Sequence, residues 1–180
     1  MLLGRVIGTV WATRKDPGLV GMTFLIVEEL DLDGEPVGGF VVAADVLARL
    51  AAAHSADVEV EAGDGWHGSG TGAVRVEHDG DVLVVSEAGV WGPDGARPMR
   101  WRATSRWRLD GAALAVEHVR QGEPAAAVLD DGGAEWTCRA PHRCGADCYT
   151  VTLRIVGEAV VVAWAVSGPR KADRVVTRYA

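Results

Sequence analysis

Apolar and polar residues alternate along much of the chain after residue 55, which is typical of β-strands with one buried face. The clearest case is residues 101–109, where Trp101, Ser105 and Trp107 share a face and polar residues, mostly arginines, occupy the opposite one. Further strands are expected in the segments that follow the same habit or are rich in β-branched residues: 74–78, 82–85, 114–118, 149–155, 160–166 and 174–179. We expect about eight to ten strands after residue 55.

The dipeptide Asp-Gly recurs between the expected strands and marks their turns. It begins at residues 33, 64, 79, 94, 110 and 131. Asp-Gly suits the type I′ hairpin turn, in which both central residues need positive φ. Strands joined by short hairpins pair with their neighbours, and closing such a meander removes its exposed edges. The pattern therefore predicts an all-β fold, an antiparallel up-and-down barrel, with room inside for side chains or one small ligand.

One segment, residues 45–53, has helical spacing. Asp45 is a plausible N-cap, and Leu47 and Leu50 lie on one face of the expected helix. The helix separates two regions of different character. We expect a partial β segment over residues 1–45 and a barrel over residues 46–180.

Composition narrows the function. The chain has 180 residues, a net charge of −7 and a pI of about 5.2, which disfavours nucleic acid or a membrane surface as a partner. The sequence lacks a basic, then apolar, leader and any run of about 18 apolar residues, so a cytoplasmic location is expected. The three cysteines lie between residues 138 and 148, and their odd number favours free thiols.

The N-terminal region contains three segments that form a recognisable sequence pattern. Its segments are 3–21 (LGRVIGTVWATRKDPGLVG), 24–31 (FLIVEELD) and 38–45 (GGFVVAAD). Over residues 2–45 the chain resembles the EutN/CcmL family, whose members form pentamers that cap the vertices of bacterial microcompartment shells. The resemblance is truncated, because the family continues into further strands where this chain enters the helix. It implies about three strands of a partial OB-like module. This module either docks or oligomerises, or is a remnant that packs on the second region as extra strands.

From Asp45 onward, the order of motifs resembles a lipocalin-like (calycin-type) family of unknown function. The motifs are 68–72 (GSGTG), 87–89 (EAG), 106–107 (RW), 142–149 (HRCGADCY) and 164–171 (WAVSGPRK). This resemblance implies a barrel and a cavity rather than a reaction. The family's Asp-Gly-Arg-x-Phe-His motif is replaced here by 121–126 (QGEPAA), which alters any site built on it. We read 68–72 as a turn or bulge ahead of a strand.

No cofactor or metal is expected. The chain has no nucleophile elbow, P-loop or dinucleotide fingerprint. Cys138, His142, Cys144 and Cys148 are spaced Cys-x3-His-x-Cys-x3-Cys, which lacks the paired knuckles of structural zinc sites.

The candidate ligand-binding residues are aromatic, histidine and basic side chains on or beside the barrel strands. They are Trp101, Arg106, Trp107, His118, Tyr149, Trp164, Arg170 and Lys171. Arg106 can stack on indoles and reach an anionic group, yet by alternation it faces away from the neighbouring tryptophans. Which of the two sets lines the cavity stays open. Arg170 and Lys171 follow a strand end, where they meet a ligand carboxylate or phosphate or simply remain solvated.

These observations favour a non-catalytic protein that binds a small, partly apolar molecule, with an anionic ligand as an open alternative. A second hypothesis is a shell, vertex or cargo-docking component that associates with microcompartment shell proteins or with itself through residues 1–45. A third is a small enzyme in the barrel mouth, with His118, Glu87 or Tyr149 as acid or base.

Overall fold

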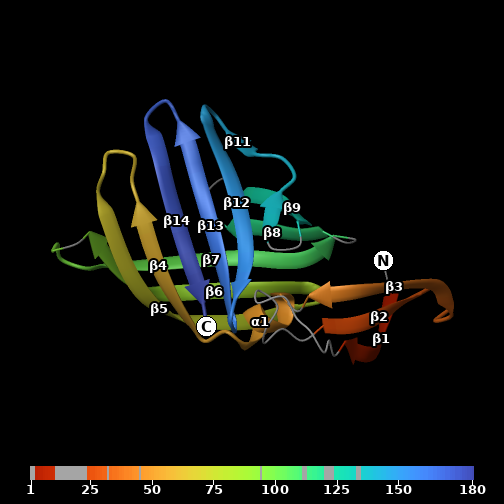
Figure 1. Cartoon of the computed structure of the whole chain (residues 1–180). Helices are drawn as coiled ribbons and strands as arrows, with labels where there is room; N and C mark the ends of the chain where they lie inside the picture. Colours follow the sequence, from red (N-terminus) through yellow and green to blue (C-terminus); the bar gives the residue numbers. More distant parts are fainter. Residues whose placement is uncertain are drawn as a thin grey trace. The chain divides into compact units, whose positions relative to one another are not determined.

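A computed structural model of the chain describes residues 3–10, 24–31, 33–44, 46–93, 95–110, 113–119, 124–132 and 135–180 (Figure 1). The chain divides into two compact units, residues 1–46 and 47–180. Asp45, the expected N-cap of the helix, lies outside the described residues.

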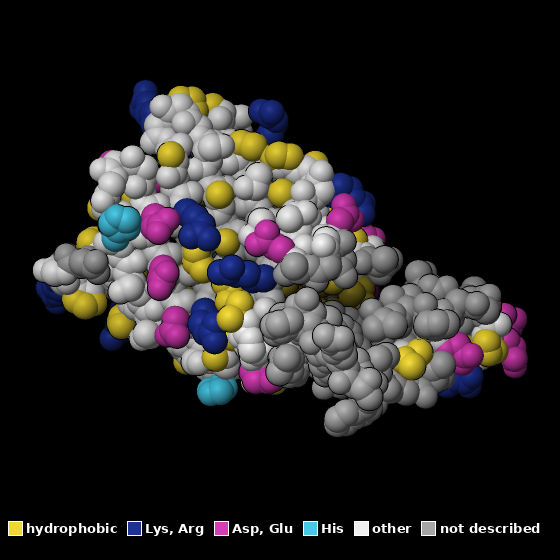
Figure 2. Space-filling model, in the orientation of Figure 1, with side chains coloured by type: hydrophobic (Ala, Val, Ile, Leu, Met, Phe, Trp, Pro, Cys, Tyr) yellow, Lys and Arg dark blue, Asp and Glu magenta, His cyan; other side chains and the backbone are white. Residues whose placement is uncertain are grey.

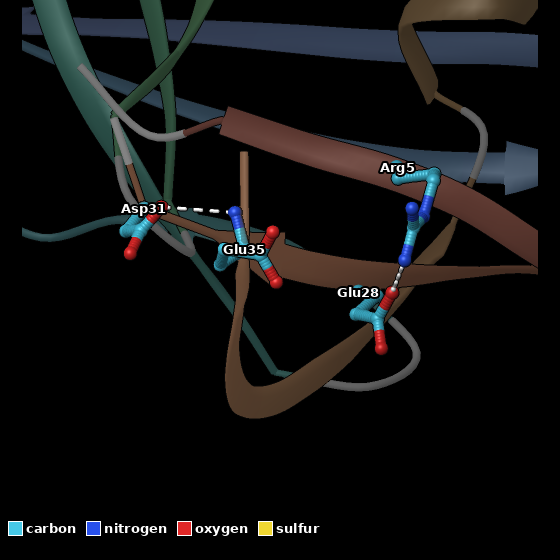
Figure 3. A network of polar contacts seen from close by, with 4 residues as sticks. All are labelled: Arg5, Glu28, Asp31 and Glu35. Atoms are coloured by element: carbon cyan, nitrogen blue, oxygen red, sulfur yellow. Dashed lines mark hydrogen bonds and ion pairs between the residues drawn. The ribbon is translucent and has the colours of Figure 1, made fainter. Parts of the chain in front are cut away.

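The N-terminal unit is a three-stranded antiparallel sheet in the order β1-β2-β3. Its strands are β1 (Leu3–Val10), β2 (Phe24–Leu30) and β3 (Pro36–Ala44). Figure 3 shows its polar contacts: Arg5 Nη2 pairs with Glu28 Oε2 at 2.6 Å across β1 and β2, and Asp31 Oδ1 accepts the backbone N–H of Glu35 at 2.9 Å. The expectation of about three N-terminal strands is confirmed.

The second unit is a closed antiparallel barrel. Its elements are α1 (Val46–Ala52), β4 (Ser55–Glu61), β5 (His67–Asp79), β6 (Val82–Pro93), β7 (Met99–Asp110), β8 (Ala113–Val119), β9 (Ala125–Asp131), β10 (Trp136–Cys138), β11 (His142–Cys144), β12 (Asp147–Val156), β13 (Ala159–Gly168) and β14 (Lys171–Tyr179). Consecutive strands pair from β4 to β10, β14 returns to β4, and β10 pairs with β12. In the described residues ten strands close the barrel and β11 flanks it, which confirms the predicted up-and-down topology.

Buried and exposed side chains alternate along the strands, and the buried ones form the core of the barrel. On β12, Tyr149, Val151 and Leu153 are buried while Arg154 is exposed. The same alternation on other strands builds a core whose largest fully buried members are Trp107, Leu50, Leu114, Leu129, Leu153, Val85, Val116, Val151, Val160 and Val162. Every one of these except Leu50 comes from a strand.

The short helix α1 is held at one end of the barrel by packing and one polar clamp. Leu50 is fully buried, and Arg49 donates to the backbone oxygen of Gly157 at 3.2 Å and to Glu158 Oε2 at 2.8 Å, both in the β12–β13 turn. A seven-residue helix is marginal in water on its own, so these tertiary contacts account for its presence.

The hairpin after β5 differs from the expected type I′ turn. Asp79 pairs with Val82, which leaves Gly80 and Asp81 as the central residues. Gly80 has φ of +63°, and in the described residues only glycines have positive φ. A positive φ at the first central residue alone is typical of type II′, so the type I′ expectation is wrong at this hairpin.

The glycine-rich segment 68–72 lies inside β5, so the expectation of a turn or bulge is wrong. Glycine is the residue that fits there because neighbouring groups come close. A Cβ at Gly72 would lie 2.9 Å from the backbone oxygen of Ala88 and 3.0 Å from Cζ2 of Trp101. The absent side chain leaves space for an indole from β7.

Candidate functional site

A cavity of about 330 Å³ lies within the barrel. Its volume falls in the lower part of the range typical of small-molecule sites. The wall is mostly aromatic and aliphatic, with a few polar groups. The lining residues are Val58, Glu87, Trp101, Ala103, Ser105, Trp107, His118, Ala125, Tyr149, Val162, Trp164, Val166, Val175, Thr177 and Tyr179.

The odd-numbered positions of β7 supply one side of the wall. Trp101, Ala103, Ser105 and Trp107 all line the cavity, which answers the question that alternation left open: the tryptophan face points inward. Register carries this surface onto the next strands, because Ser105 pairs with His118 on β8 and His118 pairs with Ala125 on β9.

A buried chain of hydrogen bonds crosses the wall. The hydroxyl of Tyr179 donates to Oε1 of Glu87 at 2.7 Å, and Ser105 and Thr177 also hydrogen-bond to the Tyr179 side chain. The indole N–H of Trp107 donates to Oγ of Ser105 at 2.8 Å. These hydrogen bonds offset the desolvation cost of burying the polar groups, because each group has a partner.

Burial changes the acid–base properties of this pair. Removal from water raises the pKa of the Glu87 carboxyl above 4.5, and the hydrogen bond from Tyr179 opposes part of that rise. The pKa of Tyr179 is raised well above 10.0, first by burial and then by the neighbouring Glu87. The tyrosine therefore remains a hydrogen-bond donor while the carboxyl has a weakened tendency to ionise.

Three further aromatic residues complete the wall. The rings of His118 and Trp164 lie 6.2 Å apart in a tilted arrangement, and Tyr149 meets His142 edge-on at 6.0 Å. The indole nitrogen of Trp101 is shielded from solvent and has no hydrogen-bond partner among the described residues. An unpaired N–H of this kind costs about 1–3 kcal/mol.

Five of the eight sequence-predicted ligand residues line the cavity together: Trp101, Trp107, His118, Tyr149 and Trp164. Arg106 lies on the outer side of β7, where its Nη2 pairs with Oδ2 of Asp79 at 3.3 Å. Arg106 also borders an outer groove of about 570 Å³ together with Arg108, Arg139 and Arg143.

Arg170 and Lys171 lie in the β13–β14 turn region, away from the cavity wall. They border a surface hollow with Trp66 and Asp64. Lys171 Nζ pairs with Asp147 Oδ2 at 2.7 Å, and this hydrogen bond raises the pKa of the lysine. All three cationic candidates therefore lie outside the cavity.

The buried polar residues of the wall were largely missed as ligand contacts. Sequence reasoning named Glu87 only as a possible acid or base and passed over Tyr179 and Ser105. Ser105 had a local signal, since it shares the inward face with Trp101 and Trp107. The Tyr179–Glu87 contact spans 92 positions and has none.

Outside the cavity, charges are mixed. Figure 2 shows acidic and basic side chains interspersed over the face formed by β4 and β14. Register places Arg174 opposite Glu61 and Arg178 opposite Asp57. On this face no single sign dominates.

Cys138, Cys144 and Cys148 are free and partly buried. Within the described residues, no three His, Cys, Asp or Glu side chains gather as a metal site would require. The described helices also include none long and apolar enough to cross a membrane.

Two families match different parts of the chain. One, described as a family of unknown function (DUF6314), matches residues 51–180, more than two thirds of the chain. The other, described as ethanolamine utilisation protein EutN/carboxysome, matches residues 1–54 and so reaches past residue 45. The predicted EutN/CcmL resemblance is confirmed. The lipocalin-like relationship of the barrel stays a prediction.

Two curated relatives match about a quarter of the chain. A carboxysome shell vertex protein CcmL from Gloeobacter violaceus is 44% identical over 45 residues, which are 25% of this chain and 45% of the relative. The CcmL of Synechocystis sp. is 45% identical over 47 residues, or 26% and 47% of the two chains. The chain thus spans less than half the length of these relatives.

Proposed function

This chain belongs to a family of unknown function, DUF6314, whose description names no activity, and we propose that its barrel is a non-catalytic module that binds a small, partly apolar molecule. The observation that carries the proposal is the interior cavity of about 330 Å³. Aromatic side chains such as Trp101, Trp107 and Trp164 offer large apolar contact there, and the Glu87–Tyr179 pair offers polar contact.

Binding is tested with the full chain and an uncharged aromatic probe, naphthylmethanol, by isothermal titration calorimetry. Native mass spectrometry of gently purified protein adds a search for a ligand carried from the cell. We expect saturable binding at one site. Ala103→Phe, which fills the cavity, should weaken binding, whereas the matched Ala88→Phe on the exposed outer face of β6 should not.

Thermal melts establish that both variants fold. The proposal fails if the probe does not bind, or if the outward substitution weakens binding as much as the inward one.

A second candidate function rests on the N-terminal unit. Its match to the EutN/carboxysome family and its likeness to two carboxysome shell vertex proteins favour association with microcompartment shell proteins or self-association. Such a role would locate the protein with a microcompartment inside the cell. The barrel would then bring its ligand site to a shell.

Shell association is tested by co-expressing the full chain, or a variant lacking residues 1–45, with microcompartment shell proteins. Sedimentation of the assembled shells should carry the full chain and leave the shortened one behind. Equal sedimentation of both, or of neither, would exclude this role for the N-terminal unit.

A further inference from the structure

The cavity wall has no lysine or arginine among its described residues. Among the described lining residues, the acidic and basic side chains are Glu87 and His118, and none is lysine or arginine. The arginines of β7 illustrate the separation: Arg106 and Arg108 border the outer groove instead. In the described residues, a bound anion would therefore meet no guanidinium or ammonium inside.

Glu87 is an integral part of the wall. It is 6% exposed, pairs across strands with Ala103, and is held by the Tyr179 hydroxyl at 2.7 Å. Ala103, which has a small side chain, also lines the cavity. Tyr179 engages Oε1, and we take Oε2 as the oxygen available to a ligand.

Two features of the wall disfavour an anionic ligand: the negative charge of ionised Glu87 and the lack of lysine and arginine among the described lining residues. If the carboxyl is ionised, it repels a second negative charge in a medium that screens poorly. If it is protonated, the ligand's charge leaves water without a lysine or arginine of the described lining to compensate it, which costs several kcal/mol. An uncharged ligand with a hydroxyl or amide group suffers neither penalty and can donate to Oε2 or accept from the protonated acid.

We propose that the cavity selects uncharged, partly aromatic ligands that carry a hydrogen-bonding group, and that Glu87 makes it reject anions of the same shape. This inference rests on the proposed binding function and adds its ligand class. It disfavours the anionic alternative that Arg106, Arg170 and Lys171 suggested from sequence.

The test uses two probes of matched shape, uncharged naphthylmethanol and anionic naphthoate, titrated into the full chain at neutral pH by calorimetry. We expect naphthoate to bind at least about tenfold more weakly, since even part of a charge-burial cost exceeds a tenfold ratio. In Glu87→Gln the amide oxygen can still accept from Tyr179, so folding is retained. The variant removes the negative charge of ionised Glu87, so the ratio between the probes should narrow. The matched control is Glu59→Gln, which removes the same charge from an exposed position on β4 and should leave the ratio unchanged.

Each outcome has one meaning. Naphthoate binding as tightly as naphthylmethanol overturns the selection while leaving the binding function intact. A ratio that Glu87→Gln does not alter removes Glu87 as its cause. If neither probe binds, the proposed binding function itself fails. The comparison on the unsubstituted chain stands even if a variant does not fold.

Discussion

Tyr179, at the end of β14, and Glu87, in the middle of β6, meet inside the barrel although 92 positions separate them. Two effects on the Glu87 carboxylate oppose each other in this pair: burial destabilises its charge and the hydrogen bond from Tyr179 stabilises it. The carboxyl loses its hydration on burial, and the hydrogen bond from the Tyr179 hydroxyl replaces part of that lost stabilisation. Buried acids of this kind commonly mark functional sites, and here the acid lies in the wall of the cavity.

The conflict predicts a pH-dependent stability. The folded pKa of Glu87 is raised, so as pH rises through 4.5 the unfolded chain releases this proton first. The folded state then holds more protons, and its stability falls until pH passes the raised pKa. Glu87→Gln should lack this fall. In urea denaturation at a series of pH values, the free energy of unfolding of the variant relative to the unsubstituted protein should rise from about pH 4.5 upward and then level off.

Tyr179→Phe is the companion to that measurement. It removes the hydrogen bond that lowers the pKa of Glu87, so the fall in stability should extend to higher pH than in the unsubstituted protein. Parallel profiles for all three proteins would contradict the assignment.

The sequence predicted which residues share a face but not which face is inside. The alternation of Trp101, Ser105 and Trp107 was readable, because period-2 spacing is local. Their inward orientation was not, since arginines and tryptophans both occur in barrel interiors. Glu87 and Tyr179 were beyond reach for a different reason: their contact depends on barrel closure, which places β14 beside β4.

Among the elements, the hairpin after β5 was predicted at the right place but with the wrong turn type. Asp79-Gly80 does mark a turn, yet the strand includes Asp79, and Gly80 becomes the first central residue. The segment 68–72 misled for a related reason. Glycines usually mark turns, but Gly72 lies within β5 and leaves room for Trp101.

Gly80→Ala isolates the backbone requirement of the turn. A Cβ at Gly80 meets no atom within 4 Å, so no steric clash contributes, and φ of +63° alone sets the cost. We expect a loss of about 1 kcal/mol in the free energy of unfolding, measured by urea denaturation. Asp81→Ala, at the exposed neighbouring position, should change it by less than about 0.5 kcal/mol. Equal effects would argue against the positive φ.

Helix α1 buries Leu50 completely. Leu50→Ala should reduce the free energy of unfolding by about 2–5 kcal/mol, because Leu50 is fully buried and its removal leaves a void. The same substitution at Leu109, which is 58% exposed, should change it by less than about 0.5 kcal/mol. Comparable losses would mean that Leu50 is not buried in the core as described.

At the scale of the whole molecule, the barrel has its own closed sheet and core, and the N-terminal strands form a sheet of their own. We therefore expect residues 46–180 to fold without residues 1–45. The shortened chain should unfold in one cooperative step when followed by circular dichroism and by tryptophan fluorescence, and should bind naphthylmethanol as the full chain does. Loss of the cooperative step would show that the barrel needs the preceding strands.

Closure also joins the two ends of the barrel. The backbone N–H groups of His54 and Ser55 donate to the oxygen of Ala180 at 2.9 and 3.0 Å, and Ala180 donates back to Ser55 at 3.1 Å. Tension applied between residues 54 and 180 would thus act on one end of the antiparallel β4–β14 ladder and peel its bonds one at a time, the geometry of an opening zipper. Under such a load this ladder would open from the Tyr179 end, so Tyr179 and then Thr177 would leave the cavity wall early.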